Sequence, residues 1–358
     1  MTDNLFDRLA DLFSSPGPVN WRLAREVAES VAGPSAPIDP WAADQLLDLV
    51  PTAQRLVAAG TPLDAMALPA PPSIHDRRSW AGSASEGLAY LAAPIAERMG
   101  AVGGELGAML QPLAPSLVGM QVGALSGMVS RRVCASFDRG IIESSARAPT
   151  FVPDNLTELA DGHGFDRQQV TMWAALREVA HQAILEVPWT HEHLEMLGDA
   201  HAASTDIDDE ALQERLRLLQ DPDAIQRVLD GGDTPEIFDE PTEFSEAHQR
   251  LTAFYSVIDG YGTAIVQRVG AAYLPDLDRI EAALDARRSE ARGQEGLAHG
   301  LLGVSLDPGV PSRGAAFCGD VARRWGDDAL DRLWEGPEML PTDTELDDPT
   351  GWAARVLL

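Results

Sequence analysis

Lysine is absent from this chain of 358 residues, and all 27 of its basic residues are arginine. The absence excludes Schiff-base catalysis by lysine, the lysine of a P-loop and the conserved lysine of protein kinases. Acidic residues number 56, which gives a net charge of −29. Nucleic acids and anionic membranes attract clustered basic side chains, so we expect neither as a partner. The acidic excess mainly indicates solubility.

Cysteine is almost absent as well. The only two, Cys134 and Cys318, are far apart in the sequence. They provide neither a disulfide framework nor the ligand spacing of a zinc ribbon, and they fit a reducing compartment. The amino-terminal residues lack the basic and apolar regions of a secretory signal. We therefore expect a cytoplasmic protein.

No apolar run is long enough for a clean membrane span. Residues 101–130 come closest, and they place Gly119, Gly123 and Gly127 at the four-residue spacing that lets helix backbones approach closely. Polar residues and prolines interrupt this stretch of the chain, at Glu105, Gln111, Pro112, Pro115 and Gln121. The pattern favours a buried helical hairpin. If the chain has no active site, these helices provide packing or an oligomer interface; the oligomeric state itself does not follow from the sequence.

Apolar residues recur at helical spacing through most of the chain, which predicts a mainly α fold with few or no strands. Residues 148–156 are the one segment expected to be extended. We expect a single domain over residues 1–358, with an alternative division into residues 1–150 and 151–358. The expected helices are Phe6–Phe13, Trp21–Val31, Trp41–Ala59 with a kink or break at Pro51, Arg77–Met99, helices within 104–139, Asn155–Ala160, Asp166–Val187, His191–Ala203, Asp208–Leu219, Ser245–Val269, Leu277–Ala291 and Ala315–Trp325.

The most informative segment is residues 173–189, which differs by one residue from the H-E-x-x-H helix of zinc proteases. In that motif two histidines at i and i+4 bind zinc, and the glutamate acts as general base on the metal-bound water. Glu178 and His181 are present, but Arg177 stands at the first ligand position. A guanidinium has no lone pair for a metal.

The residues leave two alternatives open. In the first, His181 recruits further zinc ligands from Asp259, Glu186 or the segment His191–His193, since catalytic zinc needs three protein ligands. In the second, Arg177 pairs with a carboxylate such as Asp259, and His181 is a satisfied buried histidine. A guanidinium at the ligand position would also repel the cation.

Several further segments resemble the zincin-like hydrolase family of actinobacteria, whose members are homologues of zinc-dependent metalloproteases. The resemblance covers nearly the whole chain. The order and spacing of the matching segments are more specific than any one motif. The matching segments include residues 18–25, 77–80, 93–99, 119–127, 151–156, 173–189, 221–224, 258–262, 284–288, 313–317, 333–341 and 352–356.

The resemblance implies a zincin-like helical domain with Glu178 as general base and His181 as second zinc ligand. It places Asp259 where the family has a glutamate as third ligand, one methylene shorter. Arg177 stands at the first ligand position and departs there from the family motif. Zinc distances are fixed near 2.0–2.2 Å, so both departures affect the site.

These observations support three hypotheses. The chain is a zincin relative that has lost its chemistry and acts in binding or regulation, with Arg177 holding the carboxylate of a peptide or protein ligand. Alternatively, it is an active metal-dependent peptidase with rearranged ligands, Glu178 as base and Arg177 stabilising an oxyanion. The third hypothesis is a structural or interaction protein without a site.

Overall fold

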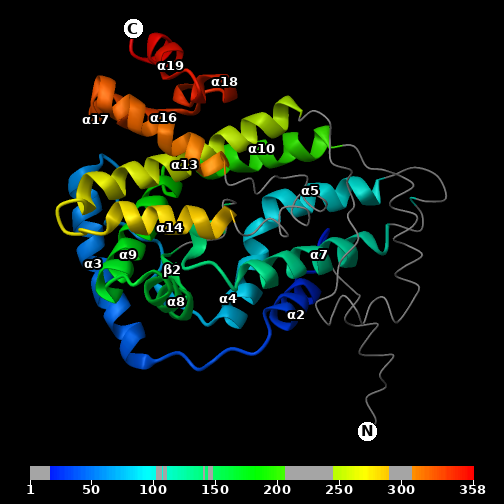
Figure 1. The fold of residues 1–358 in the computed structure, drawn as a ribbon. Helices are drawn as coiled ribbons and strands as arrows, with labels where there is room; N and C mark the ends of the chain where they lie inside the picture. Colours follow the sequence, from blue (N-terminus) through cyan, green and yellow to red (C-terminus); the bar gives the residue numbers. More distant parts are fainter. Residues whose placement is uncertain are drawn as a thin grey trace.

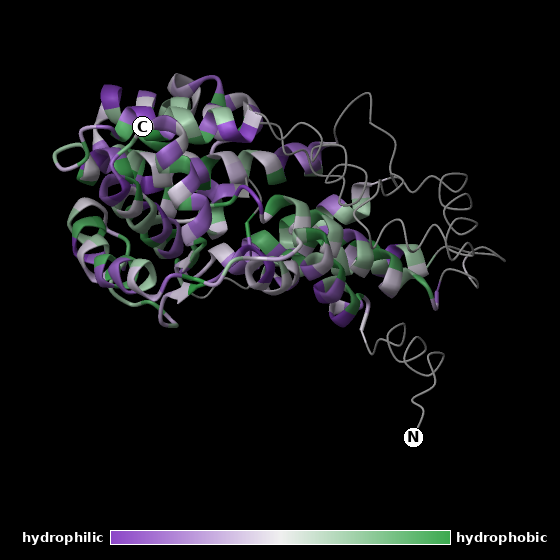
Figure 2. Cartoon of the chain, turned by 60° about the horizontal axis from the view of Figure 1, so that its bottom comes forward, coloured by the Kyte–Doolittle hydropathy of each residue, from purple (hydrophilic) through white to green (hydrophobic). Residues whose placement is uncertain are grey.

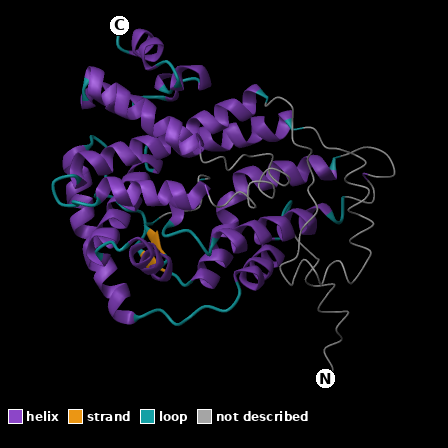
Figure 3. Cartoon of the chain, viewed as in Figure 1, coloured by secondary structure: helices purple, strands orange, loops and turns teal. Residues whose placement is uncertain are grey.

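The fold is mainly α, as the sequence predicts. The computed structural model describes residues 17–101, 107, 111–139, 142–143, 148–205, 245–289 and 309–358. Its strands, β1 (Ser73–Ile74) and β2 (Thr150–Phe151), pair in parallel (Figure 3). The longer helices, shown in Figure 1, are α2 (Trp21–Ala32), α3 (Pro40–Gly60), α4 (Arg77–Ala84), α5 (Ala89–Gly100), α7 (Ala114–Val129), α8 (Pro153–His163), α9 (Arg167–Leu185), α10 (Thr190–Ser204), α13 (Glu246–Gly270), α14 (Leu277–Ser289), α16 (Gly309–Trp325) and α19 (Pro349–Val356).

Most predicted helices agree with the observed ones to within a few residues, but two predictions need correction. The helix expected over Arg77–Met99 is divided into α4 and α5 by a 3-10 turn, η1 (Ser85–Leu88). Gly87 of this turn lies so close to Glu143 that a Cβ would be 2.8 Å from the Glu143 Cβ. Helix α16 begins at Gly309 rather than Ala315, because proline is tolerated in a first helical turn and Pro311 does not end it. Two predicted helices, Phe6–Phe13 and Asp208–Leu219, lie outside the described residues.

The glycine stripe of α7 packs inside the molecule. Helix α2 lies against α7, and a Cβ on Gly119 or Gly127 would be 2.6 Å from the carbonyl oxygen of Asn20 or Ala28. The glycines therefore serve a close contact between two helices of this chain. No helix in the described part of the chain combines the length and the apolarity needed to cross a bilayer.

One cluster of buried apolar side chains includes residues from Val19 to Val356. Most helices carry both apolar and polar residues on one ribbon, as amphipathic helices do (Figure 2). Cys134 and Cys318 are buried free thiols. Helix α9 lies within this core, in contact with α3, α8, α13 and α14.

Candidate functional site at the α9 helix

Helix α9 carries the altered zinc-protease motif into the protein interior. Asp166 caps its first turn by accepting a hydrogen bond from the amide of Gln169. Fourteen of its 19 residues are buried, including Arg177, Glu178 and His181. The motif is therefore surrounded by protein rather than exposed along an open cleft.

Arg177 contacts Asp259 of α13. Its Nη2 donates a hydrogen bond to Oδ1 of Asp259, while its Nη1 donates to the hydroxyl of Thr263 at 3.1 Å. Its Nε lies 3.4 Å from Oδ1 of Asp138. The Arg177 side chain is 1% exposed, so this is a fully buried ion pair. The ion pair considered in the sequence analysis is present, and Arg177 holds a carboxylate of its own chain.

Helix α14 adds two charged residues that the sequence analysis missed. Arg288 donates to both oxygens of Asp259, at 3.0 and 3.3 Å. Glu281 lies 3.9 Å from Arg177 and accepts a hydrogen bond from the indole of Trp173 at 2.7 Å. Burial alone would raise the pKa of Asp259, but the charges of Arg177 and Arg288 hold it well below its usual range. Asp259 is therefore an ionised carboxylate between two guanidinium groups.

A short 3-10 turn, η2 (Ser136–Arg139), covers the motif. The amide of Phe137 donates to Oε1 of Glu178 at 3.2 Å, and the ring of Phe137 stacks on His181 at 4.8 Å between centroids. Asp138 faces Arg177 and also accepts from the amides of Cys134 and Ala135, at 2.8 and 3.0 Å. Two adjacent residues of η2 thus contact all three residues of the altered motif.

The surroundings of Glu178 disfavour a negative charge on its carboxyl group. Its side chain is fully buried, and that burial, together with the nearby Asp138 carboxylate, raises the pKa of Glu178 well above its usual range. The Phe137 amide opposes this shift without cancelling it. The base predicted by the resemblance is thus a buried carboxyl group whose surroundings favour its neutral form over its charged form.

His181 is fixed by its own helix. Its Nδ1 is 2.7 Å from the carbonyl oxygen of Arg177, and its Nε2 is 3.7 Å from Oδ1 of Asp259. Burial and the Arg177 charge lower the pKa of His181. On α13, Gly262 makes room for the ring, because a Cβ there would be 2.5 Å from Cε1 of His181.

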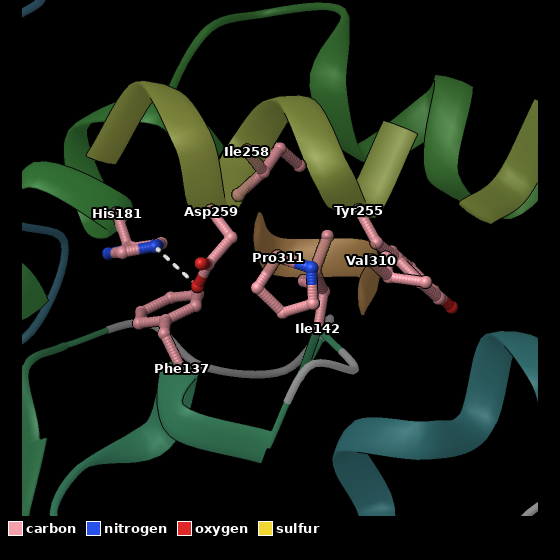
Figure 4. A pocket seen from close by; sticks show the side chains of 8 residues that line it. All are labelled: Phe137, Ile142, His181, Tyr255, Ile258, Asp259, Val310 and Pro311. Carbon is pink, nitrogen blue, oxygen red and sulfur yellow. Dashed lines mark ion pairs between the residues drawn. The ribbon is translucent and has the colours of Figure 1, made fainter. Parts of the chain in front are cut away.

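Beside His181 the structure contains a small cavity with an empty volume of about 290 Å³, including its opening to solvent. His181 and Asp259 lie together at one end, and Val310 lies toward the other (Figure 4). The remaining lining residues are Phe137, Ile142, Tyr255, Ile258 and Pro311.

The other residues considered as zinc ligands do not line this cavity. Glu186 accepts a hydrogen bond from Gln182. His193 lines a separate, open groove of about 470 Å³ bordered by α10, α13 and residues 337–344. His191 and His193 lie on α10, where i and i+2 side chains diverge.

The described residues do not fit a zinc ion beside α9. Arg177 occupies the first ligand position, and its guanidinium bonds Oδ1 of Asp259, the oxygen nearest to His181. A cation there would meet the charges of both Arg177 and Arg288. Within the described ranges, no group of three or more His, Cys, Asp and Glu side chains is placed to hold a metal ion.

A family model of zincin-like metallopeptidases matches residues 19–353, so the chain belongs to that family.

Among solved structures, the chain is similar to a crystal structure from Chloroflexus aurantiacus, described as a candidate hydrolase with a novel fold. The two share 23% identity, with a TM-score of 0.68 over 94% of this chain and 98% of that one. At this identity the likeness shows the fold alone. None of the curated proteins compared matches the sequence.

Proposed function

We propose that this chain is a zincin relative in which an internal ion-pair network replaces the catalytic metal, and that it acts by binding rather than by peptide hydrolysis. One observation carries the proposal: the guanidinium at the first ligand position bonds the carboxylate at the third. Breaking this pair would leave two buried charges with less compensation, at a cost of up to about 3–5 kcal/mol. Zinc would have to offset that cost before it bound.

The state of Glu178 supports the same proposal. Peptide hydrolysis needs a carboxylate that accepts a proton from the attacking water. Glu178 is instead fully buried, accepts a hydrogen bond from the Phe137 amide and does not line the cavity beside His181. We infer that Glu178 now has a structural role in holding η2 against α9.

The proposal is tested by zinc analysis and peptide hydrolysis on the purified full-length chain. We expect zinc well below one equivalent and no hydrolysis that depends on Glu178. Two variants distinguish the effect of removing the positive charge from the effect of supplying a zinc ligand. Arg177→Met only removes the guanidinium, whereas Arg177→His removes it and also supplies an imidazole. Only Arg177→His should gain zinc affinity.

One equivalent of zinc in the wild type, with hydrolysis abolished by Glu178→Gln, would overturn the proposal in favour of an active peptidase with rearranged ligands. If the chain binds no ligand of any kind at the α9 site, the interaction-protein hypothesis would replace it.

A further inference from the structure

The cavity beside His181 has almost no free room. The space in it that a water-sized molecule can occupy is about 20 Å³, which is enough for about one water molecule. The side chain of His181 is only 1% exposed. A molecule larger than water therefore reaches His181 only after part of the protein has moved.

Phe137 of η2 closes this cavity over the imidazole of His181. The two rings are stacked, with centroids 4.8 Å apart and planes inclined by 16°. Phe137 is buried, and its amide donates to Oε1 of Glu178 at 3.2 Å. Figure 4 shows its ring next to both His181 and Asp259, at the end of the cavity where these two residues lie. The stacked ring thus covers one face of the imidazole.

The next residue, Asp138, connects η2 to the ion-pair network. Its Oδ1 lies 3.4 Å from Nε of Arg177, and neither side chain is more than 2% exposed. Its Oδ2 accepts hydrogen bonds from the amides of Cys134 and Ala135, which fixes the turn that leads into η2. A buried carboxylate needs a compensating positive charge. Arg177 therefore attracts Asp138, and with it Phe137, toward α9.

The contacts of η2 can break while the rest of the site stays assembled. Without them, Arg177 still donates to Asp259, and Asp259 still pairs with Arg288. On the amino-terminal side of η2, the amide of Val152 donates to the carbonyl oxygen of Cys134 at 2.9 Å, which anchors the chain at that point. Displacement of η2 from α9 therefore requires only local changes.

We propose that η2 is a strap that closes the altered zincin site, with Phe137 covering His181 and the pair between Asp138 and Arg177 holding the strap in place. Arg177 then has two effects, because it occupies the first ligand position and also keeps other molecules away from His181. A ligand reaches this site only when η2 is displaced. The inference rests on the proposed function, since it takes Arg177 rather than a metal as the group that organises the site.

The reaction of histidines with diethyl pyrocarbonate measures how often His181 is uncovered, because the reagent is much larger than water. The chain has no lysine to compete for it. Full-length protein is treated in EDTA for increasing times, and mass spectrometry of its peptides gives a rate for each histidine. His163 is the reference, since it also stacks on a phenylalanine, Phe165, but is exposed. We expect His181 to react at least roughly tenfold more slowly than His163.

Two variants test the two parts of the strap. Phe137→Ala removes the cover of His181. Asp138→Asn keeps an oxygen for the amides of η2 but removes the charge that Arg177 attracts. Each should raise the rate at His181 roughly tenfold or more, because local opening becomes more frequent.

Two controls separate local opening from general loss of stability. Phe165→Ala deletes the same type of ring from another stack, the one with His163, and should leave His181 slow. His201, which is 2% exposed on α10, should stay slow in every variant because it reports global unfolding.

The inference is overturned if wild-type His181 reacts as fast as His163, if Phe137→Ala leaves it slow, or if its rate rises only together with that of His201. An unchanged rate in Asp138→Asn would overturn the role given to Arg177. Repeating the wild-type reaction without EDTA distinguishes the two proposals. A fast reaction under both conditions contradicts only this inference, whereas protection that EDTA removes indicates a metal on His181 and contradicts the proposed function.

Discussion

Arg177 donates a hydrogen bond from Nη2 to Oδ1 of Asp259, which joins the two residues that the family resemblance predicts at the first and third zinc-ligand positions. The two substitutions are therefore structurally linked. A buried guanidinium at residue 177 needs a carboxylate partner, and Asp259 is that partner. Asp259 also pairs with Arg288, so the three side chains form one ion-pair network.

The ion-pair network should be essential for stability. Arg177→Met leaves Asp138 and Asp259 buried with less compensation, so we expect the free energy of unfolding to fall by about 3–5 kcal/mol. Urea denaturation measures it. Arg167→Met is the matched control, because the pair between Arg167 and Asp161 is exposed and should contribute little. Equal effects of the two substitutions would contradict a dominant role for the buried network.

Glu178→Gln should change how stability depends on pH. Because burial holds the folded-state pKa of Glu178 above its ordinary value of 4.5, the stability contributed by its neutral form is complete below that pH and is lost as pH rises through the folded pKa. Glutamine can still accept from the Phe137 amide but cannot ionise. The variant should therefore gain stability relative to wild type between about pH 5 and about pH 8. The urea midpoints of the variant and of the wild type are compared at both ends of this pH range. A difference between the two proteins that stays constant across the range would argue that Glu178 is ionised throughout.

Gly262→Ala tests the placement of His181. The new Cβ would meet the imidazole at 2.5 Å, so the ring must move, at a cost of about 1–3 kcal/mol. Gly319→Ala, on an exposed position of α16 with nothing within 4 Å of its Cβ, is the control and should be neutral or stabilising by up to about 1 kcal/mol. Thermal denaturation distinguishes the two. Similar melting temperatures would show that His181 is not confined as described.

Gly127→Ala tests the intramolecular role of the glycine stripe in α7. A Cβ there would be 2.6 Å from the Ala28 carbonyl oxygen, and helices α2 and α7 must separate. We expect lower stability with the oligomeric state unchanged, measured by denaturation and light scattering. Gly162→Ala, which meets nothing within 4 Å on α8, is the control. A change of oligomeric state without loss of stability would support the oligomer-interface alternative instead.

Local sequence signals were enough to predict helix α9 and to place the altered motif on it. The pairing of Arg177 with Asp259 was one of the two alternatives that the sequence left open, and the structure contains it. The helix and the motif can be recognised because the residues that define them lie close together in the sequence.

Asp138, Glu281 and Arg288 could not be found in the same way. Arg288 belongs to a correctly predicted helix, but nothing in its spacing distinguishes a buried arginine from the exposed ones nearby. Asp138 lies in a short turn whose position depends on long-range contacts, including the bridge between Ala135 and Phe151. Tertiary packing, rather than local propensity, decides which of these charges faces Arg177.

We propose that Arg177 excludes a metal ion from the α9 site. Crystals of the wild-type protein soaked in excess zinc, with diffraction recorded at the zinc absorption edge, test it most directly. We predict no anomalous peak near His181 and an intact pair between Arg177 and Asp259. A peak about 2.0–2.2 Å from Nε2 of His181, with the Arg177 side chain displaced, would contradict the account.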